Sequence, residues 1–225
     1  IYASVFVLCL QIFAKKKKQK TILTAAYILG FIVIIYQATI VQSQVIELRD
    51  AYLVYQSNAS IYFLLHYVGV FFSMIILVNL IRYMKPIDTI SSNLYRALLW
   101  FTSILIVLTL SIELDHCMVL IGYQNIETIS EVLAVSHRIG YPILWAFCSL
   151  FLMITGVKRQ LKDLRIASLV LFVTAFVKLF IFDLKQINES ERIIAFISLG
   201  SILLVISFMY QKLKRFWKER EEEEI

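Results

Sequence analysis

Lysine and arginine residues alternate with long apolar runs along this chain of 225 residues, and no other feature constrains the fold as strongly. Of the 22 Lys and Arg residues, 17 fall in every second gap between the runs. They occupy four segments, residues 15–20, 82–96, 158–165 and 212–220. Because Lys and Arg in short loops are retained on the cytoplasmic side, this pattern predicts a polytopic membrane protein with its N-terminus outside and its C-terminus in the cytoplasm.

The apolar runs indicate about seven membrane segments. A helix needs roughly 20 apolar residues to cross a hydrocarbon core of about 30 Å. The predicted segments are 1–14, 21–43, 61–81, 97–114, 139–157, 166–184 and 193–210. The first has only 14 residues and begins with Ile, so we expect a truncated helix and a longer parent protein. A secretory signal peptide is the competing interpretation, but its positive charge would precede the apolar stretch.

The composition favours the same fold class and excludes a soluble domain. Hydrophobic residues make up 60% of the chain and charged residues 17%, which is more apolar than ordinary soluble domains. We predict an all-α transmembrane helix bundle over residues 1–211 and a charged cytoplasmic tail over residues 212–225. The formal net charge of +6 reflects topology, so the expected partner is the lipid bilayer and not nucleic acid.

Lys178 lies inside the sixth apolar run, where an ammonium group is costly unless it snorkels or pairs. It lies roughly 9 Å below the predicted outer end, so its flexible stem could reach the interface. The alternative is an ion pair inside the bundle, for which Glu113 or Asp115 is better placed than Asp183. Together with Arg192, these residues form a candidate polar vestibule on the outer side, suited to an anionic headgroup or to a proton.

All three histidines map to the predicted outer side: His66, His116 and His137. Neutral imidazoles with Asp115 or Glu113 would suit Zn²⁺ with an open position for water. Chance co-location is the simpler interpretation, because there are only three histidines and three predicted outer segments. The spacing does not require a metal site either, since no His-x-x-x-His pair appears. Apart from zinc at these histidines, no cofactor is expected.

Two predicted outer segments have further features. The longest, residues 116–138, carries Ile126, Ile129 and Leu133 with helical spacing, so we expect an amphipathic helix along the interface or across the end of the bundle. The first outer loop, residues 44–59, is expected to lie in the same way.

The C-terminal third contains a set of motifs that resembles a known family. They are residues 142–145, 164–165, 178–184, Arg192, 196–200 and 210–212. This part, about 70 residues long, is similar to the end of the bacterial predicted-membrane-protein family catalogued as domain of unknown function 2339. The resemblance implies that Lys178, Asp183 and Arg192 belong to a family pattern, and it implies the bacterial cytoplasmic membrane as the location. It implies no activity.

Three functions from different classes remain open. The leading hypothesis is a protein of the cell envelope that handles or transports a lipid or glycan through the outer vestibule, and is not an enzyme. The second is a membrane-embedded hydrolase or transferase that uses the histidines. The third is a structural subunit that binds partner subunits in a larger membrane complex.

Overall fold

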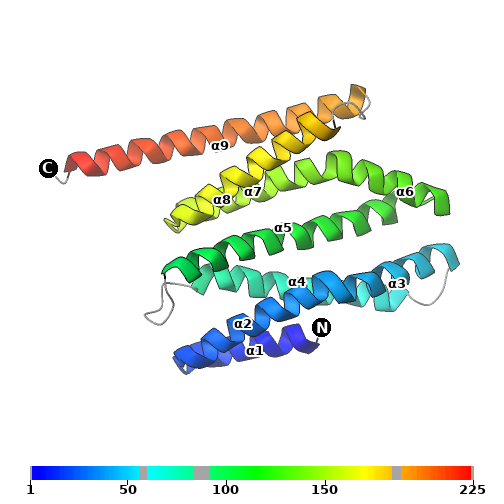
Figure 1. Ribbon diagram of the computed structural model, residues 1–225, viewed down its shortest axis with the longest axis horizontal. Helices are drawn as coiled ribbons and strands as arrows, with labels where there is room; N and C mark the ends of the chain where they lie inside the picture. The colour runs from blue at the N-terminus through cyan, green and yellow to red at the C-terminus, as the bar shows by residue number, and fades with distance from the viewer. Residues whose placement is uncertain (1, 56–59, 84–91, 184–188, 224–225) are drawn as a thin grey trace. The chain divides into compact units, whose positions relative to one another are not determined.

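The computed structural model describes residues 2–55, 60–83, 92–183 and 189–223, and within these ranges the chain is helical throughout, without strands (Figure 1). The predicted all-α fold is therefore confirmed. Each predicted segment corresponds to one continuous stretch of helix, which we call a rod and which can join several α- and π-helical elements. The elements are α1 Tyr2–Lys16, α2 Lys20–Tyr36, η1 Gln37–Val41, α3 Gln42–Tyr55, α4 Ser60–Tyr83, α5 Ser92–Gly122, α6 Ile126–Val135, η2 Ser136–Gly140, α7 Tyr141–Lys158, α8 Lys162–Val177, η3 Lys178–Asp183 and α9 Glu189–Glu223. The segments η1, η2 and η3 are π-helical and each continues an α-helix.

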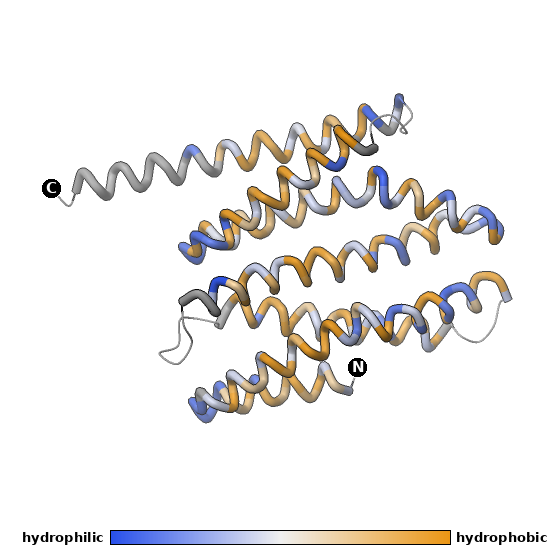
Figure 2. Tube along the Cα trace, viewed as in Figure 1, coloured by the Kyte–Doolittle hydropathy of each residue, from blue (hydrophilic) through white to orange (hydrophobic). Residues whose placement is uncertain are grey.

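Five rods are long and apolar enough to cross a membrane. They are Thr21–Tyr55, Ile61–Ile81, Tyr95–Gly122, Ile126–Lys158 and Lys162–Ile181. Only 22% to 39% of their most apolar windows is buried inside the protein, so the larger part of each window is exposed or half-buried, as a lipid-facing surface requires. Figure 2 shows hydrophobic residues along these rods and hydrophilic ones at the turn between α1 and α2. The inside–outside orientation stays a prediction.

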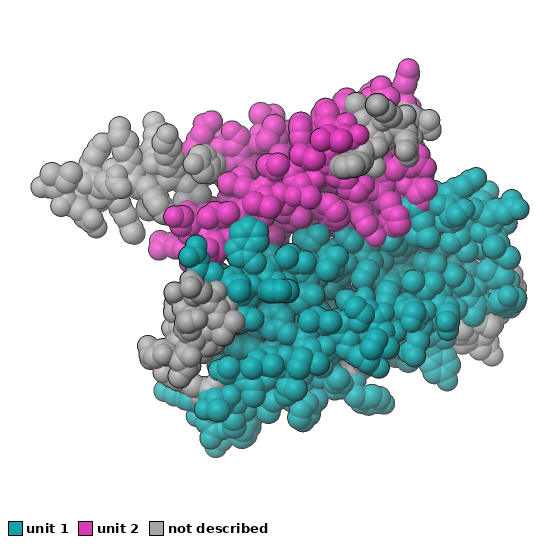
Figure 3. Space-filling view, in the orientation of Figure 1, with its two compact units in different colours: residues 1–133 teal, residues 134–225 magenta. Residues whose placement is uncertain are grey.

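The chain divides into two compact units, unit 1 over Ile1–Leu133 and unit 2 over Ala134–Ile225 (Figure 3). In unit 1, α4 contacts α1, α2, α3 and α5, so it is the central helix. In unit 2, α7 contacts both α8 and α9. The single domain over residues 1–211 stays a prediction.

Several helices extend beyond the ends that hydropathy predicted. The first outer loop, expected over residues 44–59, is helical as far as Tyr55. Helix α5 runs to Gly122 although its apolar run ends at residue 114, and α9 continues into the charged tail as far as Glu223. An apolar run ends where polar residues begin. A helix, in contrast, can continue wherever its polar side chains find hydrogen-bond partners or water.

The helix expected near Ile126 is confirmed as α6. Asn125 precedes it and accepts a hydrogen bond from the Thr128 backbone N–H through Oδ1 at 3.0 Å. This bond satisfies one of the free N–H groups at the helix start.

The hairpins α1–α2 and α7–α8 are closed by the same type of turn. Lys18 and Gln160 adopt left-handed backbone conformations, with φ of 54° and 57°. The next residue in each case bonds back across the helix end, from Gln19 N to Ala14 O at 3.0 Å and from Leu161 N to Gly156 O at 2.9 Å. Such bonds satisfy carbonyls at a helix C-terminus and turn the chain sharply.

Candidate functional site

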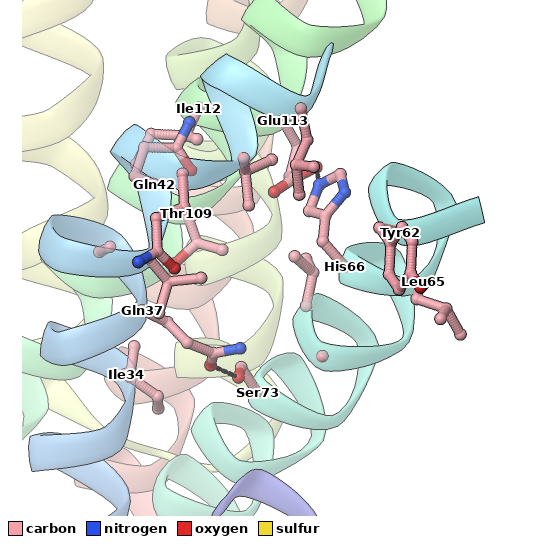
Figure 4. Close-up of a pocket in the computed structure, with 17 residues that line it drawn as sticks. Ile34, Gln37, Gln42, Tyr62, Leu65, His66, Ser73, Thr109, Ile112 and Glu113 are labelled. Atoms are coloured by element: carbon pink, nitrogen blue, oxygen red, sulfur yellow. Dashed lines mark hydrogen bonds and ion pairs between the residues drawn. The ribbon is translucent and has the colours of Figure 1, made fainter. Parts of the chain in front are cut away.

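A cavity of about 320 Å³ lies inside unit 1 (Figure 4). Its walls come from the continuous rod α2–η1–α3, from α4 and from α5. Nine lining residues are apolar, and eight carry polar side chains: Gln37, Gln42, Gln44, Tyr62, His66, Ser73, Thr109 and Glu113. Because the walls belong to candidate membrane spans, the hydrocarbon around them supplies no water for these polar groups.

The π-helical segment η1 brings two glutamines onto the cavity wall. In an α-helix, residues five apart lie about 140° round the axis. A π-helix bonds residue i to i+5 and places such residues closer to the same face. Gln37 and Gln42 are five apart across η1 and both line the cavity. The irregular turn therefore shapes the site, as π-bulges at functional sites often do.

His66 on α4 and Glu113 on α5 form the ionisable pair of the wall. His66 Nε2 lies 3.2 Å from Glu113 Oε2, and His66 Nδ1 bonds the carbonyl oxygen of Phe63. A carbonyl oxygen can only accept, so Nδ1 carries a proton. The remaining contact then holds one proton, either on Nε2 facing a carboxylate or on Oε2 facing a neutral ring. In both arrangements the pair has no net charge.

Behind this pair, a fully buried His116 joins α5 to α3. Its ring centroid is 5.3 Å from that of His66, its Nε2 lies 2.8 Å from the amide of Gln42, and its Nδ1 lies 3.4 Å from Arg49 Nη1. Arg49 is 3% exposed and donates from Nε and Nη2 to Asp50 Oδ1 at 2.9 and 2.8 Å. A neutral imidazole has one acceptor nitrogen, so both contacts are satisfied when the Gln42 amide oxygen faces Nε2–H.

The lower end of the cavity is formed by hydrogen-bonded side chains from three helices. The Ser73 hydroxyl on α4 donates to Gln37 Oε1, which Figure 4 shows as a dashed line. Ser4 on α1 lies 3.4 Å from both the Gln37 oxygen and the Ser73 hydroxyl. Gln37 Nε2 donates no hydrogen bond within the described residues, so this lower end presents a donor that is not used.

Of the five residues predicted for the polar vestibule, Glu113 and Asp115 lie in unit 1. Glu113 lines the cavity, whereas Asp115 is not among the described lining residues. The cavity is therefore built around Glu113 together with side chains that the prediction did not include.

The other three predicted vestibule residues lie in unit 2. Lys178 begins η3, and its Nζ donates to the carbonyl oxygen of His137 in η2 at 2.6 Å. This ammonium group therefore joins two π-helical segments within unit 2. Asp183 ends η3 and its side chain lies outside the described ones; Arg192 lies in the first turn of α9. A pairing of Lys178 with a carboxylate of α5 stays a prediction.

The histidines expected to bind zinc are divided between the units. His66 and His116 are neighbours in unit 1, whereas the ring of His137 contacts that of Tyr141 in unit 2, with centroids 4.7 Å apart. Within the described ranges, no group of three or more His, Cys, Asp or Glu side chains is placed to hold a metal ion. A guanidinium also faces His116 Nδ1. The zinc site stays a prediction without support from this geometry.

Comparison with known families decides the affiliation of the chain. The family described as "Predicted membrane protein (DUF2339)" matches residues 2–213. The chain belongs to this family. The resemblance seen in the C-terminal third is thus confirmed for nearly the whole chain, and the match includes every residue of the cavity. No curated protein and no solved structure matches the chain.

For this DUF2339 chain, sequence reasoning missed Arg49, Gln37, Gln42, Ser73 and Thr109 as site residues. Arg49 was assigned to an outer loop, because hydropathy falls after residue 43. Gln37 carried the clearest signal, since an amide inside an apolar run needs a partner in a membrane. The hydroxyl residues gave no signal, because Ser and Thr can bond their own helix backbone.

Proposed function

We propose that the protein binds the polar headgroup of a lipid or glycan of the cell envelope in the cavity of unit 1, as part of handling or transporting that molecule. The observation that carries this proposal is a cavity with eight polar lining residues inside apolar spans. Polar groups in membrane helices are costly and are often functional.

The apolar part of the lining suits a ligand with a hydrocarbon portion. The larger part of the exposed cavity surface is apolar, and residues such as Val41, Leu65 and Ile112 contribute to it. A volume of about 320 Å³ is at the lower end for small-molecule sites. It is sufficient for a headgroup, while an attached chain would extend outside.

The distribution of Lys and Arg supports a place for this site in the membrane. The rods α2–η1–α3, α4 and α5 approach the predicted outer side at the ends that carry Gln44, Tyr62 and Glu113. The ligand would therefore enter from the extracytoplasmic half of what we propose is the bacterial cytoplasmic membrane.

A substitution that fills the cavity tests the proposal. Ala38 lines the cavity, so Ala38→Phe should displace the ligand. Ala97→Phe, on an exposed part of α5, makes the same chemical change away from the cavity. The full chain and both variants would be purified in mild detergent from native membranes, and bound lipids and glycans identified by mass spectrometry. The proposal requires a species that is retained by the wild type and Ala97→Phe and is lost from Ala38→Phe. It fails if all three retain the same molecules.

A further inference from the structure

We infer that the headgroup bound in the unit 1 cavity is uncharged and rich in hydroxyl groups, as a sugar or polyol is, and is not a phosphate. The inference rests on the proposed function and specifies its ligand. It differs from the expectation of an anionic headgroup near Lys178, because the cavity and Lys178 belong to different units.

The first argument is charge. No Lys or Arg is among the described residues that line the cavity. The buried cation of unit 1 is Arg49, which is turned toward Asp50 and His116 and is not a lining residue. The His66–Glu113 pair is neutral in both of its proton arrangements. An anion or a cation would therefore enter this apolar region without an opposite charge, which is strongly unfavourable.

The second argument is the pattern of hydrogen-bonding groups left over for a ligand. Gln37 Nε2 is an unused donor. When the amide oxygen of Gln42 faces His116, the amide nitrogen of Gln42 is a second donor that a ligand can use. Glu113 bonds His66 through Oε2 only. The Thr109 hydroxyl donates to Leu105 O at 2.8 Å and keeps its acceptor capacity.

These groups are a mixture of donors and acceptors distributed over three helices. A hydroxyl group both donates and accepts, so a ligand with several hydroxyls can satisfy all of them. A phosphate diester only accepts and would leave Thr109 and the carboxylate of Glu113 facing another acceptor. Phosphate is therefore disfavoured in two ways: the described lining offers no Lys or Arg to neutralise it, and the oxygens of Glu113 and Thr109 face it with acceptors.

The selectivity of the wild-type protein gives the first test. The full chain in mild detergent would be titrated with monoglucosyl-diacylglycerol, phosphatidylglycerol and diacylglycerol with identical acyl chains, and the bound fraction measured by native mass spectrometry. We expect the glucosyl lipid to bind at least about ten-fold more tightly than either of the others. Equal or tighter binding of phosphatidylglycerol, or of the diacylglycerol without a headgroup, would overturn the inference.

Competition by free glucose distinguishes the two sources of this chemistry. Displacement of the glucosyl lipid by millimolar glucose would indicate a site that recognises the sugar alone. Absence of displacement, with tight binding of the lipid, would indicate a glycolipid whose chain is also bound. Both results support a hydroxylated headgroup.

A matched pair of threonine substitutions locates the binding. Thr109 and Thr174 each donate to the backbone carbonyl four residues earlier, at 2.8 Å, but only Thr109 lines the cavity. Thr109→Val should weaken glucosyl-lipid binding by about five-fold, the effect of one neutral hydrogen bond, and Thr174→Val should leave it unchanged. Equal effects of the two would place the binding elsewhere.

The outcomes separate this inference from the proposed function. If phosphatidylglycerol binds and Ala38→Phe abolishes that binding, the cavity holds a headgroup but the chemical class is wrong. If no lipid responds to Ala38→Phe, the proposed function itself fails.

Discussion

The interiors of the two units are built from different side chains. Unit 2 has an apolar core in which α7, α8, η3 and α9 meet, formed by Ala146, Met153, Phe172, Leu179, Leu199, Ile202 and Ile206. Its buried Ser149 and Ser168 bond carbonyls three residues earlier in their own helices, and Ser168 also lies 3.6 Å from Met153 Sδ on α7. Unit 1 instead buries Arg49 and His116 and joins its helices through side-chain hydrogen bonds.

This difference shows that the two units stabilise their helix contacts in different ways. In lipid, apolar side chains gain little from leaving the solvent, so close packing and interhelical hydrogen bonds stabilise helix contacts. Unit 2 relies mainly on close packing. Unit 1 relies more on hydrogen bonds between helices, and it keeps a buried amide, Gln11 Nε2, without a hydrogen-bond partner among the described atoms.

The largest expected effect is on the packing of unit 2. A side chain at Gly156 would place its Cβ 2.8 Å from Arg165 Cγ and 3.1 Å from the Arg165 backbone nitrogen. Gly156→Leu should therefore lower the free energy of unfolding by about 3 kcal/mol, measured by circular dichroism during unfolding in mixed micelles with rising SDS. Gly200→Leu is the control, since among the described residues no atom outside the adjacent backbone of its own helix lies within 4 Å of an added Cβ. Equal losses at both positions would show that close helix contact is not what Gly156 provides.

The next effect concerns the buried cation of unit 1. Arg49→Met should lower the free energy of unfolding by about 2 kcal/mol, because the substitution removes the contact to His116 and the two bonds to Asp50. Asp50 is partly exposed and can bond water, so the loss is smaller than for a fully buried ion pair. Arg49→Lys, which keeps the charge but not the planar set of donors, should give an intermediate result in the same unfolding measurement. An unchanged stability would mean that unit 1 does not depend on its polar interior.

A polar contact in unit 2 should matter less. Lys178→Met removes the bond to the His137 carbonyl and should lower the free energy of unfolding by about 1 kcal/mol. Lys162→Met, at an exposed position on α8, should change it by less than about 0.5 kcal/mol. A loss at Lys178 greater than that at Arg49 would reverse the comparison between the units.

The smallest effect compares two buried serines. Ser73 bonds Gln37 on another helix, whereas Ser149 bonds Ala146 in its own helix. Ser73→Ala should cost about 0.6 kcal/mol, the average for an interhelical hydrogen bond in a membrane, and Ser149→Ala should cost close to zero. Replicate unfolding curves can resolve this difference, and equal values would remove the distinction between the interiors.

Helix number and approximate position could be predicted from the sequence, because an apolar run of membrane length is a property of neighbouring residues. The family was also identifiable, since its C-terminal motifs are local. The site was predicted only in part: Glu113 and His66 were recognised by their chemistry. The contacts between helices that assemble the site join residues 33 to 74 positions apart, from Ser4 and Gln37 to Gln42 and His116. The hydropathy pattern also predicted Arg49 in a loop. Hydropathy carries no information about the buried partner, His116, that allows α3 to continue as a helix through Arg49.

The π-helical segment η1 also fixes a rotational phase within the rod. Each residue of an α-helix advances about 100° round the axis, and a π-helical turn holds about one residue more than an α-helical turn. Converting residues 37–41 into regular α-helix without deleting any of them would therefore rotate α3 by about 100° relative to α2. Arg49 would then leave the side that faces His116, and Gln42 would leave Gln37. Deleting one residue of this segment together with its π-helical turn would instead keep the two faces aligned. Relatives of this chain that lack the π-helical turn should therefore also lack one residue here.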